Sequence, residues 1–142
     1  MNWYKISQSK TLNLSPFIAG EIAIEFENYD EHYEDPSDPN IQAEKSIYEK
    51  LKNGNFSFTN EELLMIGQAV LDIESKDLFE DVASNKKQLF NVEFQLGMLK
   101  PISDEVAMQA VKNGYGVKMS HFPKINGQRY EYNDNWRNNF GG

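Results

Sequence analysis

The stretch from Thr59 to Glu74 constrains the fold most, because both its start and its periodicity predict one helix. Thr59-Asn60-Glu61-Glu62 is a capping box, in which Thr59 caps the first turn and Glu62 reaches back to the backbone N–H of Thr59. Apolar residues then recur at helical spacing along one face: Leu63, Ile66, Val70 and Ile73. The sequence therefore predicts a helix over residues 60–74.

A second helix is predicted to begin at Ser15-Pro16, with serine as the N-cap and proline at the first helical position. Apolar residues follow at four-residue spacing: Ile18, Ile22 and Phe26. Ile22, Ile24 and Phe26 also alternate with glutamates, as in a strand, so residues 16–28 keep both interpretations open. The apolar stripe continues past Phe26 to Tyr29 and Tyr33, which favours the helix.

Three other segments are also predicted to be helical, and a fourth is a candidate. Residues 35–40 hold two prolines and form a loop, after which a helix is expected over residues 41–52. Residues 77–83 are a candidate for a further short helix. Residues 85–99 alternate as a strand would, but their length favours a helix that Pro101 ends. Ser103 begins the next helix, which ends at Asn113-Gly114.

The C-terminal part changes character. Residues 117–122 and 128–132 flank Ile125-Asn126-Gly127, and an Asn-Gly pair between two such runs predicts a β-hairpin. The polar tail, residues 133–142, is either flexible or docked through Trp136 and Phe140. We therefore expect a single α+β domain over residues 1–142, predominantly helical, with four to five helices and a C-terminal β-hairpin.

Composition and motifs exclude several classes of function. The chain has no cysteine, which rules out disulfides, thiolate metal sites and cysteine nucleophiles and leads us to expect a cytoplasmic protein. Its apolar runs fall short of the roughly 20 residues that span a bilayer. The sequence contains no phosphate-binding, dinucleotide-binding, zinc-protease or serine-hydrolase motif. We therefore expect no cofactor and no membrane association.

The charge is concentrated in one segment. The chain carries a net charge of −8, yet residues 11–44 hold nine acids and no lysine or arginine, while the remainder is close to neutral. A charge block of this kind is usually a solvated face, but it also creates a field that attracts a basic surface. Basic residues are few and scattered, so we expect no direct binding to nucleic acid.

These observations predict a non-enzymatic protein-binding or regulatory module that presents an acidic face to a basic partner. Carboxylates spaced along a helix can imitate a phosphate backbone, so one candidate partner is a nucleic-acid-binding protein. In size, charge and lack of motifs, the chain resembles small acidic phage proteins that inhibit host-defence nucleases. The expected partner-binding residues are Glu21, Glu25, Glu27, Asp30, Glu31, Glu34 and Asp35 for charge, with Tyr29 and Tyr33 for contact.

Two alternatives stay open. A small metal-dependent hydrolase would use His32, His121 and nearby carboxylates, since imidazole and carboxylate ligands suit zinc, iron or manganese. Nothing in the sequence brings the two histidines together, so we predict no metal site and no catalytic residue. The other alternative is a structural or assembly subunit, and the sequence leaves the oligomeric state open.

Overall fold

The structure is a computed structural model that describes residues 9–28, 38–75, 83–114, 119 and 122–141. Within these residues the chain mixes six helices with two small antiparallel sheets. The helices are α2 (Pro16–Glu25), α3 (Pro39–Lys52), α4 (Asn60–Ser75), α5 (Ala83–Gln95), α6 (Asp104–Lys112) and α7 (Asn138–Gly141). The strands are β1 (Ser9–Thr11), β2 (Ser57–Thr59), β3 (Leu99–Ile102), β4 (Lys124–Ile125) and β5 (Gln128–Tyr132).

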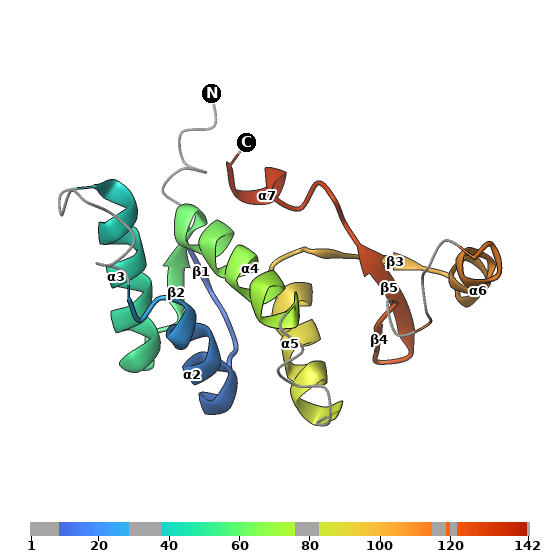
Figure 1. Cartoon of the computed structure of the whole chain (residues 1–142), viewed down its shortest axis with the longest axis horizontal. Helices are drawn as coiled ribbons and strands as arrows, with labels where there is room; N and C mark the ends of the chain where they lie inside the picture. The colour runs from blue at the N-terminus through green and yellow to red at the C-terminus, as the bar shows by residue number, and fades with distance from the viewer. Residues whose placement is uncertain (1–8, 29–37, 76–82, 115–118, 120–121, 142) are drawn as a thin grey trace.

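Helices α2 to α5 form a body around the hydrophobic core (Figure 1). Strands β1 and β2 pair antiparallel within this body, and the backbone N–H of Leu12 donates to Phe56 O at 2.9 Å just beyond the pairing. The most deeply buried apolar side chains come from all of these segments: Leu12, Ile18, Ile22, Ile47, Phe58, Leu63, Ile66, Ile73, Leu89 and Leu96. Burying this apolar surface is the main stabilisation of the body.

Strands β3, β5 and β4 form a three-stranded sheet in that order, which extends away from the body and ends at α6 (Figure 1). Strand β5 is central, and Leu99 to Ile102 of β3 pair antiparallel with Tyr132 to Arg129. Asp104 at the start of α6 accepts from Arg129 Nε at 3.1 Å, which ties α6 to the sheet. The chain is therefore elongated, with a helical body at one end and α6 at the other.

The predicted helix starts are confirmed by their capping bonds. Glu62 N donates to Thr59 Oγ1 at 3.2 Å and Thr59 N donates to Glu62 Oε1 at 2.9 Å, which completes the capping box of α4. Ser15 accepts from Ile18 N at 3.2 Å at the start of α2. Ser103 caps α6 in the same way, since it accepts from Val106 N at 3.1 Å.

Two predicted helices end earlier than expected. Helix α2 ends at Glu25, with Phe26 as its C-cap, so the prediction that the helix continues past Phe26 is wrong for the described residues. Helix α5 ends at Gln95 rather than near residue 99, because the chain turns at Gly97 with φ +75° and then enters β3. Pro101 lies inside β3 rather than ending a helix. Strand β3 is at an edge of the sheet, where a residue without an N–H is tolerated.

The Asn126-Gly127 turn joins β4 to β5. Both residues have positive φ, 51° and 82°, which is the conformation of a type I′ hairpin turn. The pairing strand is β4, Lys124–Ile125, whereas most of the predicted strand over residues 117–122 lies outside the described residues. Most of the short helix predicted over residues 77–83 lies outside them too.

The C-terminal tail packs on α4. Trp136 is 3% exposed, and a Cβ added at Gly67 would lie 2.5 Å from its ring, so α4 and the indole are in close contact. Arg137 Nη2 donates to Gln68 Oε1 at 2.6 Å, and Asn139 Nδ2 donates to Gly97 O at 3.3 Å. Figure 1 shows α7 returning above the body after β5.

Candidate interaction surface

Helix α2 holds two of the predicted partner-binding acids, Glu21 and Glu25, and its buried residues lie on one side. Its inner side chains pack into the core: Ile18, Ala19, Ile22 and Ala23. The helix is held at its start by Ser15, which accepts from Ile18 N and donates to Gln88 Oε1 of α5. This anchoring fixes which residues of α2 point outward.

The opposite side of α2 is apolar as well as acidic. Phe17 is 44% exposed and Ile24 is 58% exposed, although both are large hydrophobic residues. With Gly20 and Glu21, they recur at spacings of three and four residues, which places them on one stripe of the helix. Glu25 lies beside this stripe, one turn after Glu21. We call these five residues the α2 outer face.

The charges of the α2 outer face are placed where they destabilise the helix in isolation. Glu21 and Glu25 are four residues apart, and like charges at this spacing repel by about 0.2–0.5 kcal/mol. The helix has no acidic residue in its first turn and no basic residue in its last turn, the reverse of what the helix dipole favours. These costs apply to the helix taken alone, since Glu25 has an interaction of its own in the folded protein.

The structure locates three of the nine predicted partner-binding residues. Glu21 and Glu25 are half-exposed on α2, and Glu27 is exposed just beyond its C-cap. The structure therefore brings Glu21 and Glu25 together and leaves Glu27 at the end of the helix. The other six lie outside the described residues: Tyr29, Asp30, Glu31, Tyr33, Glu34 and Asp35.

Sequence reasoning missed the two apolar members of the surface, Phe17 and Ile24. Both fall off the stripe formed by Ile18, Ile22 and Phe26, seven residues apart on the opposite side of the helix. A helix with large apolar residues on both sides is expected to be covered on both. Phe17 and Ile24 lie on the side of the helix that was predicted to be solvated, and their apolar character was the signal in the sequence for this surface.

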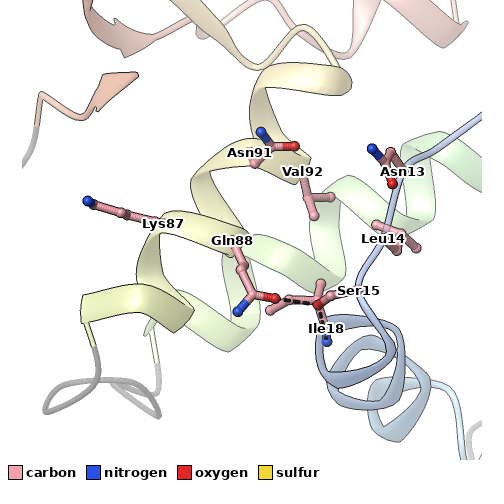
Figure 2. Close-up of a pocket in the computed structure, with 8 residues that line it drawn as sticks. All are labelled: Asn13, Leu14, Ser15, Ile18, Lys87, Gln88, Asn91 and Val92. Atoms are coloured by element: carbon pink, nitrogen blue, oxygen red, sulfur yellow. Dashed lines mark hydrogen bonds between the residues drawn. The ribbon is translucent and has the colours of Figure 1, made fainter. Parts of the chain in front are cut away.

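A small open pocket of about 220 Å³ lies between the start of α2 and helix α5 (Figure 2). Its floor is apolar, and amide and hydroxyl side chains surround it; the lining residues are Asn13, Leu14, Ser15, Ile18, Lys87, Gln88, Asn91 and Val92. Lys87 extends away from the other seven side chains in Figure 2. Typical ligand pockets are larger, about 300–1,000 Å³. The lining contains no carboxylate and no imidazole, so it offers neither of the usual acid–base groups.

Two glutamates meet where the sheet joins the body, with Glu93 buried and Glu74 partly exposed. Tyr132 of β5 donates to the two carboxylate oxygens of Glu74 at 3.0 and 2.9 Å, and its hydroxyl lies 3.4 Å from Glu93 Oε1. Glu93 is fully buried, and its Oε2 has no hydrogen-bond partner among the described residues. Burial first, and then the neighbouring Glu74, raises the pKa of Glu93 to about 10. Glu93 is therefore protonated at neutral pH, and burial also raises the pKa of the Tyr132 hydroxyl.

This glutamate pair does not form a catalytic site with the pocket. Perturbed carboxyl groups mark active sites when they face a cleft that admits substrate. Glu74 and Glu93 are not among the residues that line the pocket, and Glu93 has no exposed surface. In this position a neutral carboxyl links α5 to β5 through Tyr132.

The metal-dependent alternative depends on residues that lie outside the description. His32 and His121 both fall there, so the structure does not test whether they come together. Within residues 9–28, 38–75, 83–114, 119 and 122–141, no three histidine or carboxylate side chains are grouped to hold a metal ion. In the same ranges, no helix is long and apolar enough to cross a membrane.

Comparisons with known proteins add no relative. No protein-family model, no curated protein and no solved structure matches the chain.

Proposed function

We propose that this protein is a non-enzymatic, regulatory protein-binding module whose α2 outer face contacts a basic partner. The observation that carries the proposal is one helix face with two exposed hydrophobic residues, Phe17 and Ile24, beside two glutamates, Glu21 and Glu25. Each half of this combination is common on protein surfaces. Together they give a surface that a partner stabilises in two independent ways.

The apolar half supplies binding energy. Fully burying a Phe or Ile side chain contributes about 1.5–3 kcal/mol, and α2 leaves about half of each of these two side chains in water. Interface centres are enriched in aromatic residues that are buried on binding. Phe17 and Ile24 suit that role, because their exposure is not required by the packing of Ile18 and Ile22 on the inner side.

The acidic half selects the partner. A lysine or arginine placed against Glu21 relieves the repulsion between the Glu21 and Glu25 carboxylates. The surrounding segment, residues 11–44, has no lysine or arginine in its sequence. Electrostatic complementarity of this kind raises association rates and excludes acidic partners.

The narrower version, inhibition of a nucleic-acid-binding protein by a phosphate mimic as in phage-type inhibitors, is a special case of this proposal. A pure mimic of a phosphate backbone needs carboxylates and solvated spacing between them. Phe17 and Ile24 interrupt the acids with apolar surface, which favours a basic protein surface that also has apolar contacts. Competition between the captured partner's nucleic-acid ligand and this protein tests the special case.

Affinity capture from source cells tests the proposal when it compares three forms of the protein. The test variant is Glu21→Lys/Glu25→Lys, which also corrects the helix-dipole mismatch and should leave α2 intact. The matched control is Glu105→Lys/Asp134→Lys, which changes the charge equally at exposed positions away from α2. We expect a basic partner that wild type and control retain, that the α2 variant loses, and that salt releases. A partner retained equally by all three forms would contradict the proposal.

A further inference from the structure

The Tyr132 hydroxyl lies where three elements meet: the end of α4, the end of α5 and strand β5. The two carboxylate oxygens of Glu74 on α4 lie 3.0 and 2.9 Å from this hydroxyl, and Glu93 Oε1 on α5 lies 3.4 Å from it. We call Glu74, Glu93 and Tyr132 the junction cluster. It gathers two carboxylates and one hydroxyl from segments that are far apart in the sequence.

The hydroxyl does not satisfy both carboxylates. A tyrosine hydroxyl has one proton to donate, whereas this one faces both oxygens of Glu74 and one of Glu93. Glu93 is fully buried, and its Oε2 has no hydrogen-bond partner among the described residues. The ion pairs formed within the described part of the chain involve neither glutamate. The junction cluster therefore has more acceptor atoms than its described neighbours supply with donors.

The backbone adds negative potential at the same place. Glu74 lies in the last turn of α4, which ends at Ser75, and Glu93 lies in the last turn of α5, which ends at Gln95. The C-terminal end of a helix carries a partial negative charge that favours a cation. Neither of these two helices has a basic residue in its last turn. Two carboxylates and two helix ends therefore converge, and each of them favours a positive charge between them.

A proton meets only part of this demand. Without a cation, burial and the neighbouring Glu74 keep Glu93 protonated, which neutralises one of the two carboxylates. A divalent cation neutralises both and accepts several oxygen ligands at once, and its binding displaces the Glu93 proton to water. Carboxylate and hydroxyl oxygens, with no imidazole or thiolate, suit calcium, magnesium or manganese rather than zinc or copper.

We propose that the junction cluster binds one hard divalent cation through the carboxylates of Glu74 and Glu93 and the hydroxyl of Tyr132. Glu74 is partly exposed, so the cation enters along this side chain and keeps water in its remaining ligand positions. The bound cation joins α4 and α5 of the helical body to β5 of the three-stranded sheet. The junction cluster shares no residue with the α2 outer face, so this site does not depend on the proposed function.

Calorimetric titration with calcium, magnesium and manganese chloride in turn tests the site, in about 0.15 M potassium chloride to screen weak binding to surface acids. Glu93→Gln is the test variant, because glutamine keeps the shape and removes the charge. Glu105→Gln on α6 is the matched control, since it removes one exposed charge elsewhere. We expect wild type and control to bind one equivalent of at least one cation with a Kd below about 1 mM. Glu93→Gln should bind that cation at least about tenfold more weakly.

Melting curves show that a loss of binding is not a loss of folding. Because a ligand that binds only the folded protein stabilises it, the cation should raise the melting temperature of wild type and of Glu105→Gln above that in EDTA. Glu93→Gln should melt cooperatively in EDTA and gain nothing from the cation. Glu74→Gln gives a second variant at a partly exposed position, where folding is less at risk, and should lose the cation as well.

Manganese also locates the bound ion, because it broadens the NMR signals of nearby nuclei. We expect the amide signal of Tyr132 to broaden at lower manganese concentrations than the signals of Glu21 and Glu25 on α2. If no cation binds below about 1 mM, the junction cluster holds only a proton and the proposal is overturned. Equal affinity in wild type, Glu74→Gln and Glu93→Gln, or broadening that begins on α2, would place the cation on other acids and overturn it too.

Discussion

Glu93→Gln tests whether the buried glutamate at the junction of α5 and β5 is neutral in the folded protein. Glu93 is fully buried beside Tyr132 and Glu74, and its pKa is raised to about 10. In the unfolded chain the same carboxyl titrates at about 4.3. The folded state therefore binds one more proton than the unfolded state at every pH between these two values. The contribution of Glu93 to stability is complete below about pH 4.3 and is lost as the pH rises towards 10.

The size of the effect follows from a one-proton difference. Each pH unit in this window lowers the free energy of unfolding by about 1.4 kcal/mol, so raising the pH from about 6 to about 8 removes about 3 kcal/mol. Glutamine has nearly the same shape and does not titrate. We expect Glu93→Gln to be less sensitive to pH than the wild type by this amount, whatever its stability at a single pH.

Urea denaturation at about pH 6, 7 and 8 measures this difference, with the m-value checked for constancy. Glu105→Gln on α6 is the control, because Glu105 is exposed and removal of its charge should leave the pH dependence of the wild type unchanged. If Glu93→Gln loses stability with pH as steeply as the wild type, Glu93 is already ionised in the folded protein. The assignment of a neutral, buried carboxyl would then be refuted.

Three other substitutions test the packing. Gly20→Ala on α2 should raise the free energy of unfolding by about 0.5–1 kcal/mol in urea titration, since its Cβ would meet open space. Gly67→Ala on α4 should lower it by about 1–3 kcal/mol and change Trp136 fluorescence, because the Cβ would lie 2.5 Å from the buried ring; equal effects of the two alanines would contradict this packing. Lys50→Met should cost about 1–3 kcal/mol at neutral pH, since Lys50 Nζ lies 2.7 Å from Glu62 Oε1. Burial alone would raise the pKa of Glu62, but hydrogen bonds from Lys50, Thr59 and Ser46 hold it below its usual value. The stability that Glu62 supplies is lost as the pH falls through this lowered pKa, so the destabilisation by Lys50→Met should shrink in acid. A difference in the free energy of unfolding between wild type and variant that stays constant with pH would contradict this role of Lys50.

The sequence predicted most reliably the elements that local chemistry determines. The capping box at Thr59 fixes the start of α4 without help from distant residues, and the helix observed over Asn60–Ser75 differs from the prediction by one residue. The Asn126-Gly127 turn is local in the same sense, because its positive φ values suit those two residues. Ser15 and Ser103 cap their helices for the same reason.

Elements that depend on distant partners were not predictable in this way. The end of α5 and the strand β3 depend on pairing with β5, which lies about thirty residues later in the chain. Alternation in residues 85–99 therefore suggested a strand without indicating where it begins. The α2 outer face shows the same limit. The glutamates were visible in the sequence, but the exposure of Ile24 depends on α2 being a helix, since a strand would place Ile24 on the same side as Ile22.

The most direct test of the central claim is the salt dependence of binding between this protein and its captured partner, compared with that of Glu21→Gln/Glu25→Gln. Titration calorimetry over a range of salt gives the slope of log Kd against log salt for each form. If the α2 outer face carries the interaction, the variant binds more weakly at low salt, its slope is shallower, and the two forms converge at high salt. If both forms show the same Kd and the same slope throughout, the acids of α2 do not contact the partner, and the interaction surface lies elsewhere on the protein.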